Sequence, residues 1–257
     1  MPWPTSAAIL LQRWAALLRP RAGAAVPAVR NRPLLDAWSW HWHTAQAELR
    51  GPAIFYAEPR YWEAEFAAAV AGTGGRTTEW VAQAELAAQA AGSALPPAMA
   101  GGELRLLHAG CGISRLGTLL AASRRDLRVL NADISATAVA AAERACPAHV
   151  AERCSWHLAD ALRLPEAFQG APPFHVVMDK GLVDSLLHGG AYVAAAYLQG
   201  AAELLAPGGL LLSLSDETAA ESRLALLEAA LQGVAGMEDD LAWESWGHCV
   251  VYTARKK

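Results

Sequence analysis

The sequence is poor in cysteine, and no two of its cysteines form a Cys-x-x-Cys pair. Four cysteines occur in 257 residues, and all fall inside expected helices, strands or the turns between them: Cys111, Cys146, Cys154 and Cys249. We therefore expect reduced thiols in the core and no disulfide or metal site built from cysteine. The chain also lacks any uninterrupted apolar run near the ~20 residues that a membrane span requires. We expect no membrane insertion.

Acidic residues are missing from the start of the chain. Residues 1–35 contain no acid and no lysine, and Leu10, Trp14 and Leu17 would share one face of a helix. The same stretch holds five arginines: Arg13, Arg19, Arg21, Arg30 and Arg32. Arginine without acid, on an amphipathic segment, is typical of an organellar targeting leader. The alternative is a disordered basic tail.

The rest of the chain is acidic. The whole sequence has 21 basic and 25 acidic residues. Once the five arginines of the leader are set aside, residues 36–257 carry a formal charge of about −9. Nucleic acids require a basic surface, so this charge argues against nucleic-acid binding as the main function.

The stretch from Leu104 to Ser135 has the layout of a nucleotide-binding βαβ unit. An apolar run at its start predicts a buried strand, Gly110 to Gly112 predict a turn, and residues 114–123 look helical. A second apolar run, 127–132, ends on Asp133. Glycines let a ligand approach the backbone closely, and an acid after the second strand can accept hydrogen bonds from both hydroxyls of a ribose.

The spacing of the glycines decides which ribose ligand fits. A dinucleotide site needs Gly-x-Gly-x-x-Gly, but Arg115 occupies the third glycine position and the next glycine is Gly117. The turn therefore matches a pyrophosphate poorly and suits S-adenosylmethionine better. This excludes the usual nicotinamide oxidoreductase fingerprint. The alternative is a structural turn in which Asp133 caps the following helix.

Strands and helices alternate through the remainder. Strands are expected at 155–158, 174–178 and 210–214, helices at 136–145, 192–205 and 217–231, and a hairpin at 243–253. This order predicts an α/β fold with a doubly wound, mostly parallel, seven-stranded sheet, in which ligands bind at the carboxyl ends of the strands. Four predicted site positions fall at such ends: Gly110, Asp133, Asp160 and Asp179.

Residues 36–100 look helical and rich in tryptophan, and we interpret them as a cap over the cofactor site of the domain 101–257. His41 and His43 alternate with tryptophans, but no third ligand follows, so we expect no metal site there.

Five motifs resemble those of class I, seven-β-strand S-adenosylmethionine-dependent methyltransferases, and most closely the lysine methyltransferases among them. They are LLHAGCG (106–112), NADIS (131–135), LADA (158–161), VVMDKGLVDSLLHGG (176–190) and LAPGGLLLSLSDE (205–217). The block from Asp179 to Asp184 is the most specific, and Tyr61-Trp62-Glu63 and Glu79-Trp80 resemble aromatic patches that precede the core in this group. The resemblance spans residues 60–257.

The resemblance implies roles for individual residues. It assigns cofactor binding to His108, Gly110, Cys111, Gly112, Asp133, Ile134, Asp160, Ala161 and Asp179, a substrate channel to Tyr61, Trp62 and Trp80, and catalysis to Asp179 and Lys180. Asp179 would orient the substrate amine or receive its proton. Lys180 could instead form an ion pair with Asp184 or another acid. Two departures stand out, since His108 replaces the usual acid and Leu182 replaces a threonine.

Within the family, two groups compete. The block 213–228, with Arg223, resembles the mitochondrial citrate synthase lysine methyltransferases, and the arginine-rich leader agrees with a mitochondrial location. Tyr61-Trp62-Glu63 fits the elongation factor lysine methyltransferases at least as well. We therefore expect a protein substrate, citrate synthase before an elongation factor. Other hypotheses are a small-molecule methyltransferase, a silent cofactor-binding protein, and a plastid or cytoplasmic location.

Overall fold

The structure is a computed structural model that describes residues 56–73, 79–98, 102–216, 220–237 and 240–257. The expected leader and the histidine pair His41 and His43 lie outside these residues. Within them, no helix is long and apolar enough to cross a membrane.

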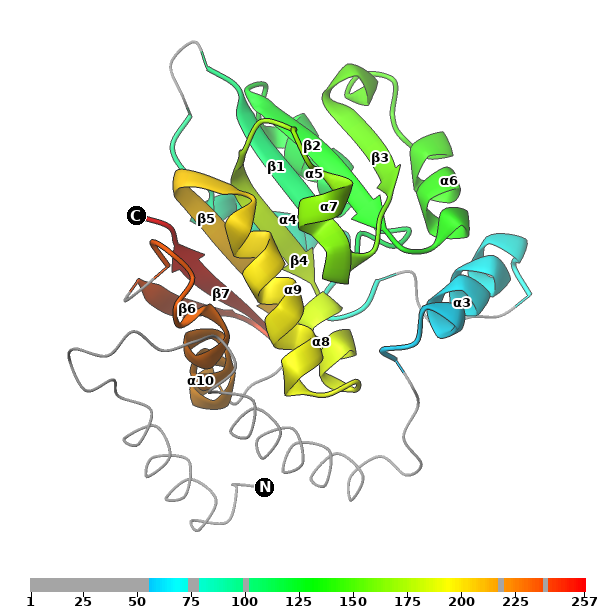
Figure 1. The fold of residues 1–257 in the computed structure, drawn as a ribbon. Helices are drawn as coiled ribbons and strands as arrows, with labels where there is room; N and C mark the ends of the chain where they lie inside the picture. The colour runs from blue at the N-terminus through cyan, green and yellow to red at the C-terminus, as the bar shows by residue number, and fades with distance from the viewer. Residues whose placement is uncertain (1–55, 74–78, 99–101, 217–219, 238–239) are drawn as a thin grey trace, which may run out of the picture.

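A seven-stranded sheet forms the centre of the molecule, in the order β3-β2-β1-β4-β5-β7-β6 (Figure 1). Strands β1 to β5 run parallel, whereas β7 is antiparallel to both β5 and β6. The strands are β1 Leu104–Ala109, β2 Leu127–Asp133, β3 Cys154–Leu158, β4 Phe174–Lys180, β5 Leu205–Ser215, β6 Leu241–Trp246 and β7 Cys249–Arg255. The predicted sheet is confirmed, and so is the predicted hairpin, in which β6 is the edge strand.

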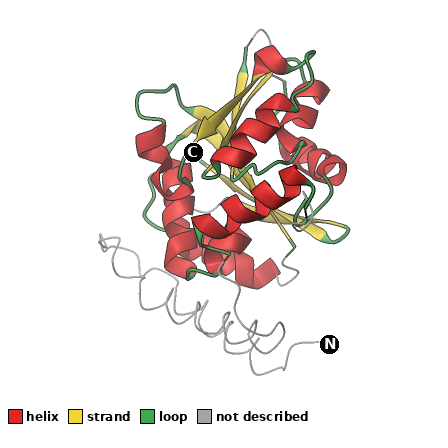
Figure 2. Cartoon of the chain, turned by 90° about the vertical axis from the view of Figure 1, so that its right-hand side faces the viewer, coloured by secondary structure: helices red, strands yellow, loops and turns green. Residues whose placement is uncertain are grey.

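Helices cover both faces of the sheet (Figure 2). Side chains of α4, α5 and α6 pack on one face, and those of α7 to α10 pack on the other. The helices are α3 Pro59–Ala71, α4 Ala84–Ala94, α5 Leu116–Ser123, α6 Ala136–Arg144, α7 Leu164–Ala167, α8 Leu182–Leu187, α9 Ala191–Glu203 and α10 Ala220–Leu231, with short 3₁₀ turns η2 Ala151–Arg153 and η3 Ala161–Arg163.

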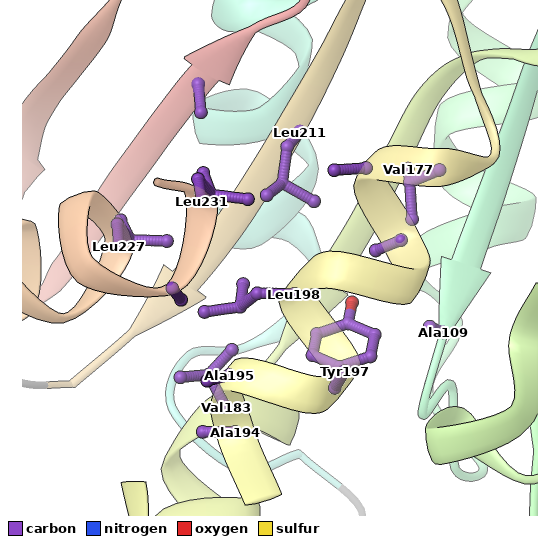
Figure 3. Close-up of a cluster of buried hydrophobic side chains, with 14 of the residues drawn as sticks. Ala109, Val177, Val183, Ala194, Ala195, Tyr197, Leu198, Leu211, Leu227 and Leu231 are labelled. Carbon is purple, nitrogen blue, oxygen red and sulfur yellow. The ribbon is translucent and has the colours of Figure 1, made fainter. Parts of the chain in front are cut away.

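The larger apolar core lies between the sheet and helices α9 and α10. Leu198 of α9 and Leu227 and Leu231 of α10 belong to the same cluster as Leu211 of β5 (Figure 3). Alternate residues of each buried strand face this core, and the others face the core under α4 and α5, because successive strand side chains point to opposite faces. Both faces of β1, β4 and β5 are therefore apolar, as in other parallel sheets.

Local sequence explains where α6 begins. Ser135 has an extended backbone, and its Oγ accepts a hydrogen bond from the N–H of Ala138 at 3.0 Å. Such a cap satisfies one of the free N–H groups of the first turn. The predicted cap is confirmed, and it fixes the chain directly after Asp133.

The two described helices before the sheet lie in different places. Helix α3 packs against α6, beside the carboxyl end of β2 (Figure 1). Helix α4 buries Ala84, Ala87 and Ala90 and packs on α5, β5 and β7. Of the two described helices in the predicted cap, α4 thus belongs to the layer that covers the sheet, and α3 lies beside the end of β2.

Candidate functional site

A cavity of about 220 Å³ opens where β1, β2 and β4 end. Its walls come from four parts of the chain: the glycine turn after β1, the segment after β2, the turn after β3 and the turn from β4 into α8. Aromatic residues of the segment before the sheet form a further wall. This is the position at which open α/β sheets bind their ligands.

The turn after β1 requires glycine at two positions. Gly110 and Gly112 have φ of +62° and +52°, a backbone conformation that glycine adopts without strain. A Cβ on Gly112 would lie 2.9 Å from the ring of Phe66, and one on Gly110 would lie 3.1 Å from Leu182. Any larger residue would therefore clash with Phe66 or Leu182, which both line the cavity. Cys111 lies between them, with a buried thiol whose pKa is raised by burial and by nearby Asp133.

Asp133 ends β2 and lines the cavity with a carboxylate that is only 6% exposed. One oxygen accepts from the N–H of Gly112 at 2.7 Å, and the other accepts from the N–H of Ser135 at 2.9 Å. Burial raises its pKa, and the negative charge of Glu63 adds to that shift. A carboxylate has about four lone-pair positions, so each oxygen can still accept one ribose hydroxyl.

Three further predicted residues line the same cavity: Ile134, Asp160 and Ala161. Asp160 caps the short turn after β3, where its Oδ1 accepts from the N–H of Leu162 at 2.9 Å. Ile134 is 37% exposed at the rim. The structure thus places an apolar side chain and a carboxylate around a space next to Asp133, as recognition of a base beside a ribose requires.

Aromatic rings make the wall opposite the glycine turn. Trp62 lies 5.1 Å from Trp80, 6.0 Å from Tyr56 and 5.7 Å from Phe66, measured between ring centroids. The indole N–H of Trp62 contacts the Oγ of Ser185 at 3.0 Å and the carbonyl of Tyr56 at 2.6 Å. Tyr61 packs edge-on against Tyr56 and Trp62 but does not line the cavity. Trp62 and Trp80, by contrast, both line the cavity.

Lys180 ends β4 and is largely buried. Its Nζ pairs with the carboxylate of Glu79 and donates to the carbonyls of Trp80, at 3.0 Å, and Ala82, at 3.1 Å. The alternative of an ion pair is therefore the arrangement observed, with Glu79 as the acid. Asp184 instead pairs with Arg223 and accepts from the hydroxyl of Ser215 at 2.7 Å.

Asp179 is fully buried and does not line the cavity. Its carboxylate accepts from the N–H of Val183 at 3.3 Å and from the hydroxyls of Tyr197, at 3.3 Å, and Ser213, at 3.2 Å. Burial and the charge of Asp184 raise the pKa of Asp179 to about 7. Asp179 therefore does not face the cavity, where the predicted contact with a substrate amine or cofactor would be made.

His108 also points away from the cavity, into the core under α5. It is 1% exposed, its Nδ1 lies 3.3 Å from Oδ1 of Asn131, and burial together with the charge of Lys180 lowers its pKa to about 4. Asn131 fills the space beside Gly117, where a Cβ would lie 2.1 Å from its oxygen. The side chain that replaces the usual acid is thus a neutral core residue.

Sequence reasoning left several residues at or near the cavity without a role. Glu63 does not line the cavity, but it accepts from the hydroxyls of Ser135 and Thr137 and so ties α3 to the start of α6. Phe66 and Ser114 do line the cavity. Phe66 follows Trp62 by four residues, which is the spacing of one helix face, so its place beside Trp62 could have been found from the sequence.

These features fit S-adenosylmethionine. The glycine turn lines the cavity, and Asp133 can accept from a ribose. Among the described residues that line the cavity, Lys180 is the one Lys or Arg, and it is paired with Glu79, so the cavity has no basic cluster for phosphates.

Comparison with known proteins supports the same assignment. A family described as "Methyltransferase domain" matches residues 107–211. The mitochondrial citrate synthase-lysine N-methyltransferases of Pongo abelii and Homo sapiens are each 34% identical to this chain over 150 residues, which are 54% of this chain and 62% of the relative. The chain thus spans less than two thirds of the curated relatives it matches.

Solved structures agree in fold. A putative O-methyltransferase from Nostoc punctiforme aligns with a TM-score of 0.57 and 16% identity, over 86% of this chain and 69% of that one. The [4+2]-cyclase SpnF aligns with a TM-score of 0.56 and 17% identity, over 77% of this chain and 94% of that one. The N-methyltransferase NodS from Bradyrhizobium japonicum, solved with S-adenosyl-L-homocysteine, aligns with a TM-score of 0.50 and 17% identity, over 79% of this chain and 99% of that one. At these identities the likeness shows the fold alone.

The glycine turn, the carboxylate of Asp133 and the matched residues 107–211 therefore agree: this chain contains a methyltransferase domain, and its cofactor is S-adenosylmethionine.

Proposed function

We propose that the chain is a protein-lysine N-methyltransferase that acts on citrate synthase in mitochondria. The observation that carries this proposal is the 34% identity to two mitochondrial citrate synthase-lysine N-methyltransferases. The arginine-rich, acid-free first 35 residues favour the same compartment. The lysine methyltransferases of a translation elongation factor are the second candidate, because the Tyr61-Trp62-Glu63 patch fits them at least as well.

The cofactor and the chain have separate tasks in this mechanism. Bound S-adenosylmethionine supplies a methyl group activated by its sulfonium sulfur. Asp133 would hold the ribose, Asp160 the adenine amine, and the turn from Gly110 to Gly112 would let the cofactor lie against the backbone. Positioning of two reactants at near-attack distance is the main source of the rate enhancement in such a transfer.

The substrate lysine must lose its proton before it can accept the methyl group. An unperturbed lysine has a pKa of ~10.4, so deprotonation at pH 7 costs roughly 4 to 5 kcal/mol. The aromatic wall of Tyr56, Trp62 and Trp80 lowers that cost, because a desolvated site disfavours the ammonium form. The same ring faces attract the incoming cation before it is deprotonated.

Asp179 has an indirect role in this proposal. It accepts from the N–H of Val183 and so holds the turn that carries Gly181 and Leu182 to the cavity wall. The proton of the amine then leaves through solvent at the cavity mouth.

The test is methyl transfer by the full chain. The protein is incubated with methyl-labelled S-adenosylmethionine and either purified citrate synthase or purified translation elongation factor, and mass spectrometry locates the label. We expect methyl-lysine on citrate synthase, lost in Asp133→Ala and kept in Asp126→Ala. Asp126 is the matched control because it lies at the opposite end of β2.

Each other outcome has a definite meaning. Label on the elongation factor alone would keep the chemistry and replace the substrate. No label on either protein, with S-adenosylmethionine still bound, would reject a lysine methyltransferase of these two substrates and favour a small-molecule methyltransferase or a silent protein.

A further inference from the structure

We propose that Lys180 is a positioning residue: with Glu79 it holds residues 79–82 so that the indole of Trp80 forms a wall of the substrate channel. Lys180 thus acts through this segment and not on the substrate amine. The role in methyl transfer rests on the proposed function, whereas the effect on Trp80 does not.

The donors of Lys180 are all directed at residues 79–82. An ammonium has three N–H donors, and three acceptors lie around Nζ: the Glu79 carboxylate and the carbonyls of Trp80 and Ala82. The side chains of Lys180 and Glu79 are only 5% and 10% exposed. With its donors engaged and its stem buried, Lys180 has none left for a substrate.

Glu79 joins this segment to the glycine turn as well. Both of its oxygens accept from the hydroxyl of Ser114, at 3.0 and 2.9 Å, and Ser114 follows Gly112 by two residues. The Lys180, Glu79 and Ser114 cluster therefore links the end of β4, the cofactor turn and the segment that carries Trp80. A buried charge pair of this kind tolerates the loss of one partner poorly.

The segment needs this support because its backbone is strained. Val81 has φ of +72° and is the only non-glycine residue with positive φ among those that the structure describes. The N–H of Ala82 donates to the carbonyl of Trp80 at 2.9 Å, so Val81 is the centre of a tight γ-turn. That turn is rare with positive φ, above all for a β-branched residue. Lys180 binds the carbonyls on both sides of Val81.

Gly181 fits the same interpretation. A Cβ at this position would lie 3.0 Å from Cγ2 of Val81 and 3.7 Å from the indole of Trp80. The glycine directly after Lys180 thus lets the strained segment rest on the turn between β4 and α8. Trp80 is then held 5.1 Å from Trp62 and 5.3 Å from Tyr56, between ring centroids.

The first test observes Trp80 itself. The full chain is labelled with 5-fluorotryptophan, and Trp80→Phe identifies the Trp80 signal in ¹⁹F NMR. In Lys180→Met we expect this signal to move or broaden, while the signals of tryptophans outside the aromatic wall stay. Lys256→Met is the matched control, since its Nζ also binds two carbonyls, of Ala202 at 3.0 Å and Leu205 at 2.9 Å, away from the cavity. An unmoved Trp80 signal in Lys180→Met would overturn the proposal.

The second test separates action through Glu79 from action on the amine. Turnover should fall about 100-fold in both Lys180→Met and Glu79→Gln. The double variant should lose no more than this, because each substitution has the same effect, the displacement of Trp80. Turnover close to wild type in Glu79→Gln, with a large loss in Lys180→Met, would show that Lys180 acts on the substrate directly and would reject the proposal.

A third variant tests the positioning role if Lys180→Met or Glu79→Gln folds poorly. Val81→Gly removes the strain, because glycine adopts φ of +72° freely. Added to Lys180→Met, it should restore the fold and part of the turnover; no recovery of the Trp80 signal would contradict the positioning role. If wild type transfers no methyl to either protein substrate, the proposed function fails, and the ¹⁹F signals still decide what Lys180 does.

Discussion

Strands β2 and β4 flank β1 and end at the same edge of the sheet, yet the charged residues at their ends have opposite surroundings. Asp133, at the end of β2, lines the cavity and accepts from the backbone N–H groups of Gly112 and Ser135. Asp179, Lys180 and Asp184, at and after the end of β4, are all bound to other side chains. The end of β2 is thus arranged for a ligand, and the end of β4 is arranged to hold a turn in place.

This difference follows from what the neighbouring elements supply. The glycine turn and the start of α6 satisfy Asp133 with main-chain donors, which leave lone pairs free toward the cavity. Around β4, residues from distant parts of the chain supply a counter-charge or hydroxyl for each charge: Glu79 for Lys180, Arg223 for Asp184 and Ser213 for Asp179. Substitutions at the two ends should therefore affect different measurements.

The largest loss of stability should come from Arg223→Met. Arg223 is 2% exposed and pairs with buried Asp184, so its removal leaves a buried carboxylate without its counter-charge. We expect a loss of about 3–5 kcal/mol in the free energy of unfolding, measured by urea denaturation. Arg128→Met removes an exposed pair with Glu103 and should cost at most about 1 kcal/mol. Equal losses in the two variants would contradict the distinction between buried and exposed pairs.

Asp133→Ala should have its main effect on the affinity for S-adenosylmethionine, whereas Arg223→Met acts on the free energy of unfolding. Two charge-assisted hydrogen bonds to a ribose are together worth roughly 3 kcal/mol or more, so affinity for S-adenosylmethionine should fall about 100-fold. Calorimetry of the full chain measures it, and Asp126→Ala should stay within about twofold of wild type, because distant sites act independently. Unchanged affinity in Asp133→Ala would falsify the assignment of this carboxylate to the ribose.

The sequence was sufficient to predict the sheet, the glycine turn and the placement of Asp133. These depend on local signals: apolar runs of strand length, glycines after a strand, and an acid followed by a capping serine. The same signals predicted that Asp160 would lie near Asp133, since carboxyl ends of parallel strands meet at one edge of the sheet.

The sequence could not tell which strand-end charges face the cavity. Lys180 and Glu79 are 101 residues apart, and Asp184 and Arg223 are 39 apart, so each pair exists only once the fold has formed. His108 shows a related limit. Its position before the glycine turn indicated a cofactor contact, but strand alternation turns it into the core beside Asn131, and neighbouring Ala109 lines the cavity.

The buried carboxylate of Asp179 should make stability depend on pH. Its pKa is raised to about 7 in the folded protein, above the value of ~3.9 expected when unfolded, so the folded state retains a proton that the unfolded state has lost. Its contribution to stability is therefore fully present below about pH 4 and is lost as pH rises through about 7.

Comparison with Asp179→Asn isolates this effect. The free energy of unfolding of the variant, relative to wild type, should increase between about pH 4 and pH 7 and stay constant above that range. Urea denaturation at several pH values, on wild type and variant, measures it. A difference that does not change with pH would mean that Asp179 is already ionised in the fold.

The smallest effect should come from Ser135→Ala, and it sharpens the comparison at the β2 end. The variant loses the cap on Ala138 and the hydroxyl contact to Glu63 but keeps the main-chain N–H that Asp133 accepts. We expect a loss of about 1 kcal/mol in the free energy of unfolding. Ser123→Ala, whose hydroxyl only binds a carbonyl of its own helix, should change it less. Affinity for S-adenosylmethionine should fall only a few fold, since the donors to Asp133 belong to the backbone; a loss as large as in Asp133→Ala would mean that the start of α6, and not the carboxylate, determines binding.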